Sequence, residues 1–242
     1  MKLAVMQPYF LPYLGYFSLI ESTEHFIFFD TPQYIRRGWM NRNRILHPKG
    51  GDNYIIVPIN KQPQNTPINR ITISQESWKN KILRQLESVY KKNAPYYTGT
   101  IELVRECVEK DYLYLAQLNI DTIINICEFI GLPINYSVFS EMDLKIEQVH
   151  APDEWALNIT KAMDYDTYRN AVGGQTFFDN SKYAMHNIRL EFVKNRLSTY
   201  NQKNGGFIPG LSIIDVLMFN SPSETLALIK DYDIITGAND GA

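Results

Sequence analysis

Two kinds of apolar pattern alternate along the chain. Short apolar runs of strand length occur at residues 3–6, 26–29, 54–59, 134–139, 168–172 and 188–193. Between them lie stretches whose apolar positions recur at helical spacing, at residues 16–22, 78–92, 112–130, 152–163, 211–219 and 223–231. Strands that alternate with helices indicate a mostly parallel sheet with helices on both faces. We therefore predict a Rossmann-like three-layer α/β sandwich.

The block at residues 78–131 is mainly helical, and it ends at the stop signal Gly131-Leu132-Pro133. We predict one α/β domain over residues 1–242, in which this block is an inserted helical region. A half-buried strand is predicted at residues 70–74, where apolar and polar residues alternate. Residues 238–242 are small and polar, which predicts a frayed end.

Residues 31–53 show little periodic apolar pattern, so we predict a long loop there, with a turn at Lys49-Gly50-Gly51-Asp52. A polar segment of this length inside a compact domain is usually functional or disordered. Its tyrosine, tryptophan and several arginines and asparagines argue against disorder. The segment is therefore a candidate binding region.

Composition narrows the class of protein. The formal net charge is -2, so no global basic field supports nucleic-acid binding, although local basic spots occur at Arg36-Arg37 and Arg42 to Arg44. The two cysteines, Cys107 and Cys127, lie in separate helical stretches, which favours a reducing compartment over a disulfide framework or a thiolate metal site. No signal peptide and no run of membrane-spanning length is present, and we expect a cytoplasmic protein.

The loop at residues 7–16, which two prolines stiffen, joins the first predicted strand to the first predicted helix. In a parallel sheet a ligand is expected outside the carboxyl ends of the strands. A helix start offers free backbone N–H groups and the positive end of the dipole, which suit phosphate or carboxylate. The alternative is an aromatic–proline turn that only closes the sheet. The candidate binding residues are Gln7, Pro8, Tyr9, Tyr13, Gly15 and Tyr16.

Asp30 ends the next predicted strand and should face the same crevice, where it would bind a sugar hydroxyl or act as a general base. The polar segment that follows supplies donors for a diphosphate or carboxylate, with a tryptophan as a stacking surface. The alternative is a solvated basic loop. The candidate binding residues are Arg37, Trp39, Asn41, Arg42 and Asn43.

Three further features are candidates. Gly173 and Gly174 follow a strand and would admit a ligand to the backbone, or would form a tight turn that needs positive φ. Asp215 is the single charge in an apolar helix, so it is paired or does chemistry, and we favour pairing with an arginine of residues 36–44. His150, in a loop, is a candidate general base.

Several chemistries lack their motifs. The four histidines are scattered without metal-ligand spacing, so no metal site is predicted. The sequence contains no phosphate-binding P-loop, no G-x-G-x-x-G and no G-x-S-x-G.

The opening loop resembles that of the HIGH-type nucleotidyltransferases, whose pattern is F-x-P-H-x-G-H. Here both histidines are replaced, by Tyr13 and Tyr16, whereas Gly15 is kept where the backbone approaches a phosphate. A tyrosine donates a hydrogen bond but is uncharged at neutral pH. The resemblance therefore favours nucleotide binding and argues against nucleotidyl transfer.

Several segments together resemble the WbqC-like protein family over nearly the whole chain. They are residues 6–17, Asp30 with residues 39–43, Gly173-Gly174, and the run from Tyr200-Asn201-Gln202 to Leu211-Ser212-Ile213-Ile214-Asp215. The resemblance adds Gln202 to the candidate binding residues and Asp215 to the candidate catalytic residues. Relatives commonly carry two adjacent acidic residues where Thr31 follows Asp30, so a role of the second carboxylate does not carry over.

The resemblance implies a role in O-antigen or other surface-polysaccharide biosynthesis. The protein would transfer an aminoacyl (glycyl) or acyl group to the amine of a nucleotide-linked amino sugar, and would work with other enzymes of that process. The acyl donor must be activated, as an ATP-derived adenylate, a thioester or a charged tRNA, and a charged tRNA is the one nucleic-acid partner expected. Asp30 or His150 would deprotonate the sugar ammonium, and backbone amides at Gly15 or Gly173-Gly174 would stabilise an oxyanion. The alternatives are a catalytically silent nucleotide-sugar-binding scaffold and, third, a nucleotidyltransferase.

Overall fold

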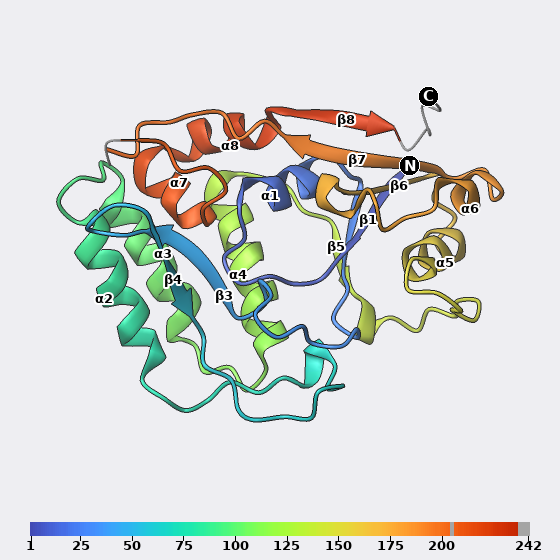
Figure 1. The fold of residues 1–242 in the computed structure, drawn as a ribbon, viewed down its shortest axis with the longest axis horizontal. Coiled ribbons are helices and arrows are strands. Elements are labelled where there is room, and N and C mark those ends of the chain that lie inside the picture. Colours follow the sequence, from blue (N-terminus) through green and yellow to red (C-terminus); the bar gives the residue numbers. More distant parts are fainter. Residues whose placement is uncertain (204–205, 237–242) are drawn as a thin grey trace.

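A computed structural model describes residues 1–203 and 206–236 (Figure 1). The predicted frayed end at residues 238–242 lies outside the described residues. The strands are β1 (Lys2–Met6), β2 (His25–Phe28), β3 (Arg42–Leu46), β4 (Asp52–Ile56), β5 (Tyr136–Val138), β6 (Thr167–Ala171), β7 (Arg189–Asn195) and β8 (Tyr232–Thr236). The helices are α1 (Leu14–Glu21), α2 (Trp78–Tyr90), α3 (Tyr97–Glu109), α4 (Leu115–Ile130), α5 (Glu154–Ala162), α6 (Asn180–Ala184), α7 (Ile213–Phe219) and α8 (Pro222–Lys230), with 3-10 turns η1 (Ile68–Arg70), η2 (Phe139–Glu141) and η3 (Val172–Gly174).

Within the described residues the main sheet has six strands in the order β5-β2-β1-β6-β7-β8. Adjacent strands from β5 to β7 are parallel, and β8 pairs antiparallel with β7. From β1 the chain adds β2 and β5 on one side and β6 and β7 on the other. The order therefore reverses between β1 and β6, which is where an open α/β sheet usually forms a ligand crevice. The prediction of a Rossmann-like α/β sandwich with a mostly parallel sheet is confirmed.

Alternate residues of the central strands enter two separate cores, one on each face of the sheet. Leu3 and Val5 of β1 join the cluster covered by α5 and α6, whereas Ala4 joins the larger cluster covered by the other helices. In β2, Phe26 and Phe28 face the larger cluster and Ile27 faces the smaller one. Both faces are buried, which explains why these strands read as continuous apolar runs in the sequence.

Helices α2, α3 and α4 fill residues 78–130 and pack their apolar stripes into the larger cluster together with α1 and α7. Figure 1 shows them in green, grouped at one end of the molecule beside the β3–β4 hairpin. Helix α4 ends where Gly131 adopts a left-handed φ of 69°, which a glycine accepts without a Cβ clash. The division of the chain into a sheet domain and an inserted helical region stays a prediction.

The sequence prediction was wrong at four places. Residues 42–46 form β3, paired with β4, where we predicted a loop, and β4 ends at Ile56 although its strand was predicted at residues 54–59. A polar residue, Asn43, interrupts the apolar pattern of β3. It can be buried because its amide donates to main-chain carbonyls. Residues 70–74 make only isolated bridges, at Thr72 and Ile73, and β8 was not predicted at all.

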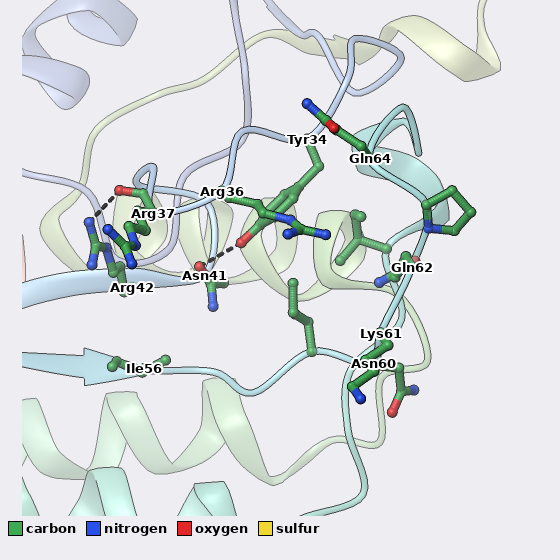
Figure 2. Close-up of a pocket in the computed structure, with 13 residues that line it drawn as sticks. Tyr34, Arg36, Arg37, Asn41, Arg42, Ile56, Asn60, Lys61, Gln62 and Gln64 are labelled. Carbon is green, nitrogen blue, oxygen red and sulfur yellow. Dashed lines mark hydrogen bonds between the residues drawn. The ribbon is translucent and has the colours of Figure 1, made fainter.

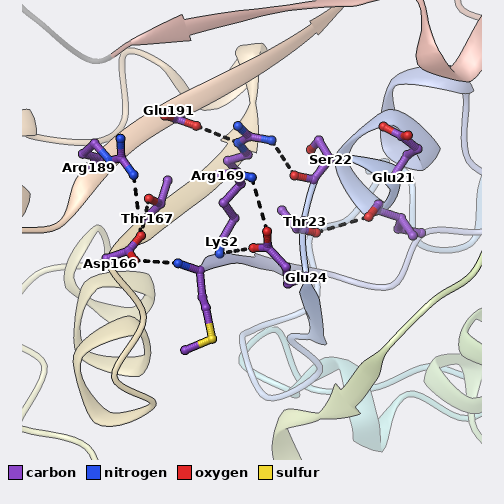
Figure 3. A network of polar contacts seen from close by, with 12 residues as sticks. Lys2, Glu21, Ser22, Thr23, Glu24, Asp166, Thr167, Arg169, Arg189 and Glu191 are labelled. Atoms are coloured by element: carbon purple, nitrogen blue, oxygen red, sulfur yellow. Dashed lines mark hydrogen bonds and ion pairs between the residues drawn. The ribbon is translucent and has the colours of Figure 1, made fainter.

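Charged residues compensate one another where the strands begin (Figure 3). The main-chain N–H of Lys2 donates to Glu24, and the amino terminus donates to Asp166 at 2.5 Å. Across β6 and β7, the Arg169 guanidinium donates to Glu191 at 2.7 Å, with both side chains about nine-tenths buried (11% and 12% exposed). These contacts tie together the amino ends of the central strands. The long polar loops lie at the opposite edge.

Candidate functional site

The opening loop between β1 and α1 is fixed from inside the protein. The amide of Asn119, a fully buried residue of α4, donates to the carbonyl oxygens of Pro8 at 2.9 Å and Met40 at 2.7 Å. Its own Oδ1 is buried without a hydrogen-bond partner. One side chain therefore joins the opening loop to the polar segment at residues 34–43. These are the two segments in which the sequence concentrates its candidate binding residues.

A second amide holds the same loop from β3. Asn43 donates to the carbonyl oxygens of Phe10 at 3.1 Å and Leu11 at 2.8 Å. The Ser212 hydroxyl donates to Leu11 as well, at 2.8 Å, and Leu11 adopts a left-handed φ of 45°. The predicted binding residue Asn43 is thus 3% exposed, and its amide is used by the loop. A direct contact with ligand is not compatible with these bonds.

The tyrosines that replace the two histidines of the HIGH-type pattern pack within the loop. Tyr16 is 2% exposed, and its hydroxyl donates to the carbonyl of Gln7 at 3.0 Å. The half-buried Tyr13 lies over Gly15, where an added Cβ would come within 2.6 Å of the tyrosine ring. Burial raises the pKa of Tyr9, Tyr13 and Tyr16, so all three are neutral hydrogen-bonding groups. These packed rings support the aromatic–proline turn that we gave as the alternative.

Asp30 follows β2 and is 2% exposed. Its Oδ1 accepts from the Ser140 N–H at 3.0 Å, and its Oδ2 accepts from the Ser140 hydroxyl at 2.5 Å. Its main-chain carbonyl accepts from the N–H of Asn69 at 2.8 Å. The carboxylate thus holds the start of η2 to the end of β2. To act as a base it would first have to be released by Ser140.

A cavity of about 600 Å³ lies between residues 34–42 and residues 56–64 (Figure 2). We call it the basic pocket, because four of its lining side chains are cationic and none is a carboxylate. Three predicted binding residues, Arg37, Asn41 and Arg42, line it, whereas Trp39 does not. The lining residues are Tyr34, Arg36, Arg37, Asn41, Arg42, Ile56, Ile59, Asn60, Lys61, Gln62, Pro63, Gln64 and Ile71.

Two residues hold one wall of the basic pocket in place. The guanidinium of Arg42 donates to the carbonyls of Gly38, at 3.3 Å, and Arg37, and lies 4.5 Å from the ring centroid of Tyr54. The side-chain oxygen of Asn41 accepts from the Tyr34 hydroxyl at 2.8 Å. Its Nδ2 donates to the main-chain carbonyl of Val57, just after β4, at 2.9 Å. The arginine charge is therefore positioned before any ligand arrives.

Other donors of the basic pocket have no partner among the described residues. Arg36 and Lys61 are exposed and make no hydrogen bond or ion pair with the part of the chain that is described. The Nε2 of Gln62 is buried and has no acceptor. Figure 2 shows Arg36 on one wall, and Lys61 and Gln62 on the other. Such a concentration of free donors suits a ligand rich in acceptor oxygens.

The buried Asp215 of α7 is held by three neutral donors. Its carboxylate accepts from the hydroxyls of Tyr90 and Tyr200, both at 2.6 Å, and from Nε2 of Gln202 at 2.9 Å. Burial raises the pKa of Asp215, and these hydrogen bonds oppose that rise. The prediction that an arginine of residues 36–44 pairs with Asp215 was wrong. Uncharged donors satisfy the carboxylate without a second buried charge.

The hydrogen bonds of Gln202 show that its side chain has a structural role. It is 3% exposed, and it exchanges hydrogen bonds with Ile208, donating to its carbonyl at 3.0 Å and accepting from its N–H at 2.8 Å. All its polar atoms are thus used to hold Tyr200 and Ile208 close to Asp215. The geometry makes this a structural cluster rather than a surface that meets a ligand.

The similarity of this chain to known proteins extends over most of its length and is not limited to one motif. Residues 7–227 match the model of the WbqC-like protein family. The chain belongs to this family. An uncharacterized Mycobacterium tuberculosis protein, Rv1507c, is 28% identical to this WbqC-like protein over 225 residues, which cover 92% of this chain and 95% of that protein. No solved structure matches it.

The glycine pair of this WbqC-like protein follows β6, in η3. Neither Gly173 nor Gly174 adopts a left-handed φ, so the tight turn that requires positive φ is ruled out. The space beside Gly173 is open, whereas a Cβ on Gly174 would lie 3.1 Å from Oδ1 of Asn170. Access of a ligand to the Gly173 backbone is consistent with this geometry.

His150 is exposed and precedes α5, and its main-chain N–H donates to the Glu154 carboxylate at 2.8 Å. It does not line the basic pocket. Within residues 1–203 and 206–236, no helix is long and apolar enough to cross a membrane. The same residues contain no group of three or more His, Cys, Asp or Glu side chains that could hold a metal ion.

The basic pocket includes residues that our candidate set lacked, namely Arg36, Asn60, Lys61, Gln62 and Gln64. Arg36 stood beside the chosen Arg37. The other four belong to the proline-punctuated loop at residues 60–69, which carries a lysine and several amides. Their polarity was visible in the sequence, but their position opposite residues 34–42 was not.

Proposed function

We propose that this WbqC-like protein binds a nucleotide-linked amino sugar in the basic pocket and transfers an aminoacyl (glycyl) or acyl group to the sugar amine. The role would belong to O-antigen or other surface-polysaccharide biosynthesis. The observation that carries the binding part is the pocket itself, with four cationic side chains and no carboxylate in its lining.

The pocket matches the chemistry of a nucleotide sugar in three respects. Arginine forks bind phosphate oxygens in a fixed geometry, and Arg42 is already held in place by the main chain and the Tyr54 ring. The amide of Gln62, whose Nε2 has no acceptor in the described chain, suits a sugar hydroxyl. The volume of about 600 Å³ lies within the range of small-ligand sites.

The transfer itself would be an acyl substitution. The neutral sugar amine attacks the carbonyl carbon of the activated donor, a C–N bond forms, and the bond to the phosphate, thiol or ribose leaving group breaks. The proton lost by the amine goes to a base, for which Asp30, after its release by Ser140, and His150 are the proposed groups. Backbone N–H groups near Gly173 would stabilise the oxyanion.

A nucleotide-sugar-binding scaffold is the second candidate. It is favoured by the engagement of Asp30 and Asp215, whose carboxylates are both buried and hydrogen-bonded. Nucleotidyl transfer has the least support. Tyr16 stands where that chemistry needs a cationic histidine, and its hydroxyl is used by Gln7.

Calorimetric titration with UDP- and dTDP-linked amino sugars tests the binding part. The double variant Arg36→Gln/Lys61→Gln removes two exposed pocket charges that make no described contact, so the fold should be retained while affinity falls at least about tenfold. The matched control is Arg84→Gln/Lys92→Gln, which removes the same charge from exposed positions outside this pocket. Equal losses in both variants, or no binding by the wild type, would refute the pocket.

A second experiment separates enzyme from scaffold. Each candidate donor is supplied with the nucleotide sugar, and product is followed by mass spectrometry for the wild type and for Asp30→Asn. The amide keeps an oxygen that accepts from Ser140 but cannot take a proton. Lost turnover with retained nucleotide affinity supports the enzyme. If no donor gives product with the wild type, the scaffold is supported.

A further inference from the structure

The cations of the basic pocket have no anionic partner in the described chain. None of Arg36, Arg37, Arg42 and Lys61 takes part in an ion pair with the described residues, and no carboxylate lines the pocket. The neighbouring carboxylate Asp52 pairs with Arg44, at 3.7 Å, rather than with a pocket arginine. Four like charges are thus left uncompensated around one cavity of about 600 Å³.

Like charges that line one cavity repel one another, because salt screens charges fully only beyond about 8–10 Å. The repulsion falls when an anion enters. A nucleoside diphosphate carries a negative charge on each phosphate, so it neutralises the cluster while its oxygens accept from the guanidinium and ammonium groups. The buried Nε2 of Gln62 gains an acceptor as well.

A divalent cation has the opposite effect in this pocket. Magnesium sites in nucleotide-binding proteins normally use one or two carboxylates together with the phosphate oxygens. The lining of the basic pocket offers no carboxylate for such a site. Magnesium would also bring positive charge among the four cations and occupy the phosphate oxygens that they bind.

From this charge arrangement we infer that the basic pocket recognises its diphosphate as a free anion, without a divalent metal ion. The arginines and the lysine take the place of magnesium. Arg42 is fixed against Gly38 and the Tyr54 ring, so this wall of the diphosphate site is formed before the ligand binds. The inference rests on the proposed nucleotide-sugar binding and specifies the charged form in which the ligand is bound.

The test is calorimetric titration of the full chain with UDP, dTDP and inorganic pyrophosphate, in EDTA and in excess magnesium chloride at equal ionic strength. We expect the dissociation constant to be about three- to tenfold smaller in EDTA, since magnesium competes for the same phosphate oxygens. Arg36→Gln/Lys61→Gln should bind more weakly in both buffers and lose less on addition of magnesium. The control Arg84→Gln/Lys92→Gln should behave as the wild type.

The outcomes separate this inference from the proposed function. An affinity in EDTA that equals or exceeds the affinity in magnesium supports the inference. Binding that is tighter with magnesium overturns it, while the pocket and the proposed function stand. No binding of any probe in either buffer overturns the pocket, and the inference falls with it.

Discussion

Tyr90 joins three parts of the larger core through one hydroxyl group. The hydroxyl donates to Asp215 at 2.6 Å and accepts from the main-chain N–H of Leu46 at 3.1 Å. An O–H···O separation of 2.6 Å is typical of a charge-assisted bond. The side chain is 1% exposed, so water cannot take over either contact. Tyr90→Phe removes both bonds and leaves the aromatic packing in place.

The magnitude follows from the two groups that lose their partner. A hydrogen bond to a charged group contributes about 1.5–3 kcal/mol, and a buried N–H left without an acceptor costs about 1–3 kcal/mol. We therefore expect Tyr90→Phe to lower the free energy of unfolding by about 3–5 kcal/mol, a large part of a typical total of about 5–15 kcal/mol. Tyr200→Phe also removes a 2.6 Å bond to Asp215 but leaves no main-chain N–H unpaired, so we expect about 1.5–3 kcal/mol.

Urea unfolding, followed by tryptophan fluorescence and by circular dichroism, measures both variants under the same conditions. The larger loss should belong to Tyr90→Phe. Asp215→Asn, alone and combined with Tyr90→Phe, gives a double-mutant cycle that isolates the bond between the two residues. A loss below about 1 kcal/mol in Tyr90→Phe, or equal losses in the two tyrosine variants, would refute the reasoning.

Two further predictions concern buried polar groups. Burial raises the pKa of the Asp215 carboxyl in the folded state above its value in the unfolded state, so the folded state binds a proton at this group more tightly. The stability that this group contributes therefore grows as the pH falls through the folded pKa, and it is complete below the unfolded pKa. The difference in unfolding free energy between wild type and Asp215→Asn should thus shift in favour of the wild type from pH 7 to about pH 4, and a constant difference would contradict this. Asn119→Asp replaces the amide that donates to the carbonyls of Pro8 and Met40 with a carboxylate that can only accept. The urea midpoint of this variant should therefore fall further than that of Asn119→Leu. Equal midpoints would disprove the role of the amide.

The fold was predictable from the sequence where a strand is buried on both faces by apolar side chains. Central strands such as β1 and β2 are covered on both faces, and their apolar runs alone located them. The hairpin strand β3 escaped prediction because one of its buried residues is an asparagine, Asn43, whose polarity is satisfied by partners about thirty residues away. Strand β8 lies at the edge of the sheet and exposes Ile234, so it has no continuous apolar run.

The candidate site was predictable as a set of segments rather than as a set of contacts. Sequence reasoning chose Arg37 and Arg42 because arginines gather in a polar loop, and both line the basic pocket. It could not pair that loop with Lys61, since no local pattern connects residues 34–42 with residues 56–64. Asn43 and Gln202 were candidate binding residues, although both amides are used inside the protein. Donor and acceptor counts do not reveal which way a polar side chain points.

The bonds that hold the opening loop have a consequence for the order of folding. The carbonyl of Leu11 accepts hydrogen bonds from Asn43, 32 residues away in the sequence, and from Ser212, 201 residues away. The carbonyl of Pro8 accepts from Asn119, 111 residues away. Closing such long loops carries a high entropic cost, so contacts of this range form slowly and late. Helices and strand pairs can assemble first, but the loop gains its final shape only after β3, α4 and α7 have all docked. The opening loop, which Asn119 joins to the polar segment at residues 34–43, is thus among the last parts of the protein to form.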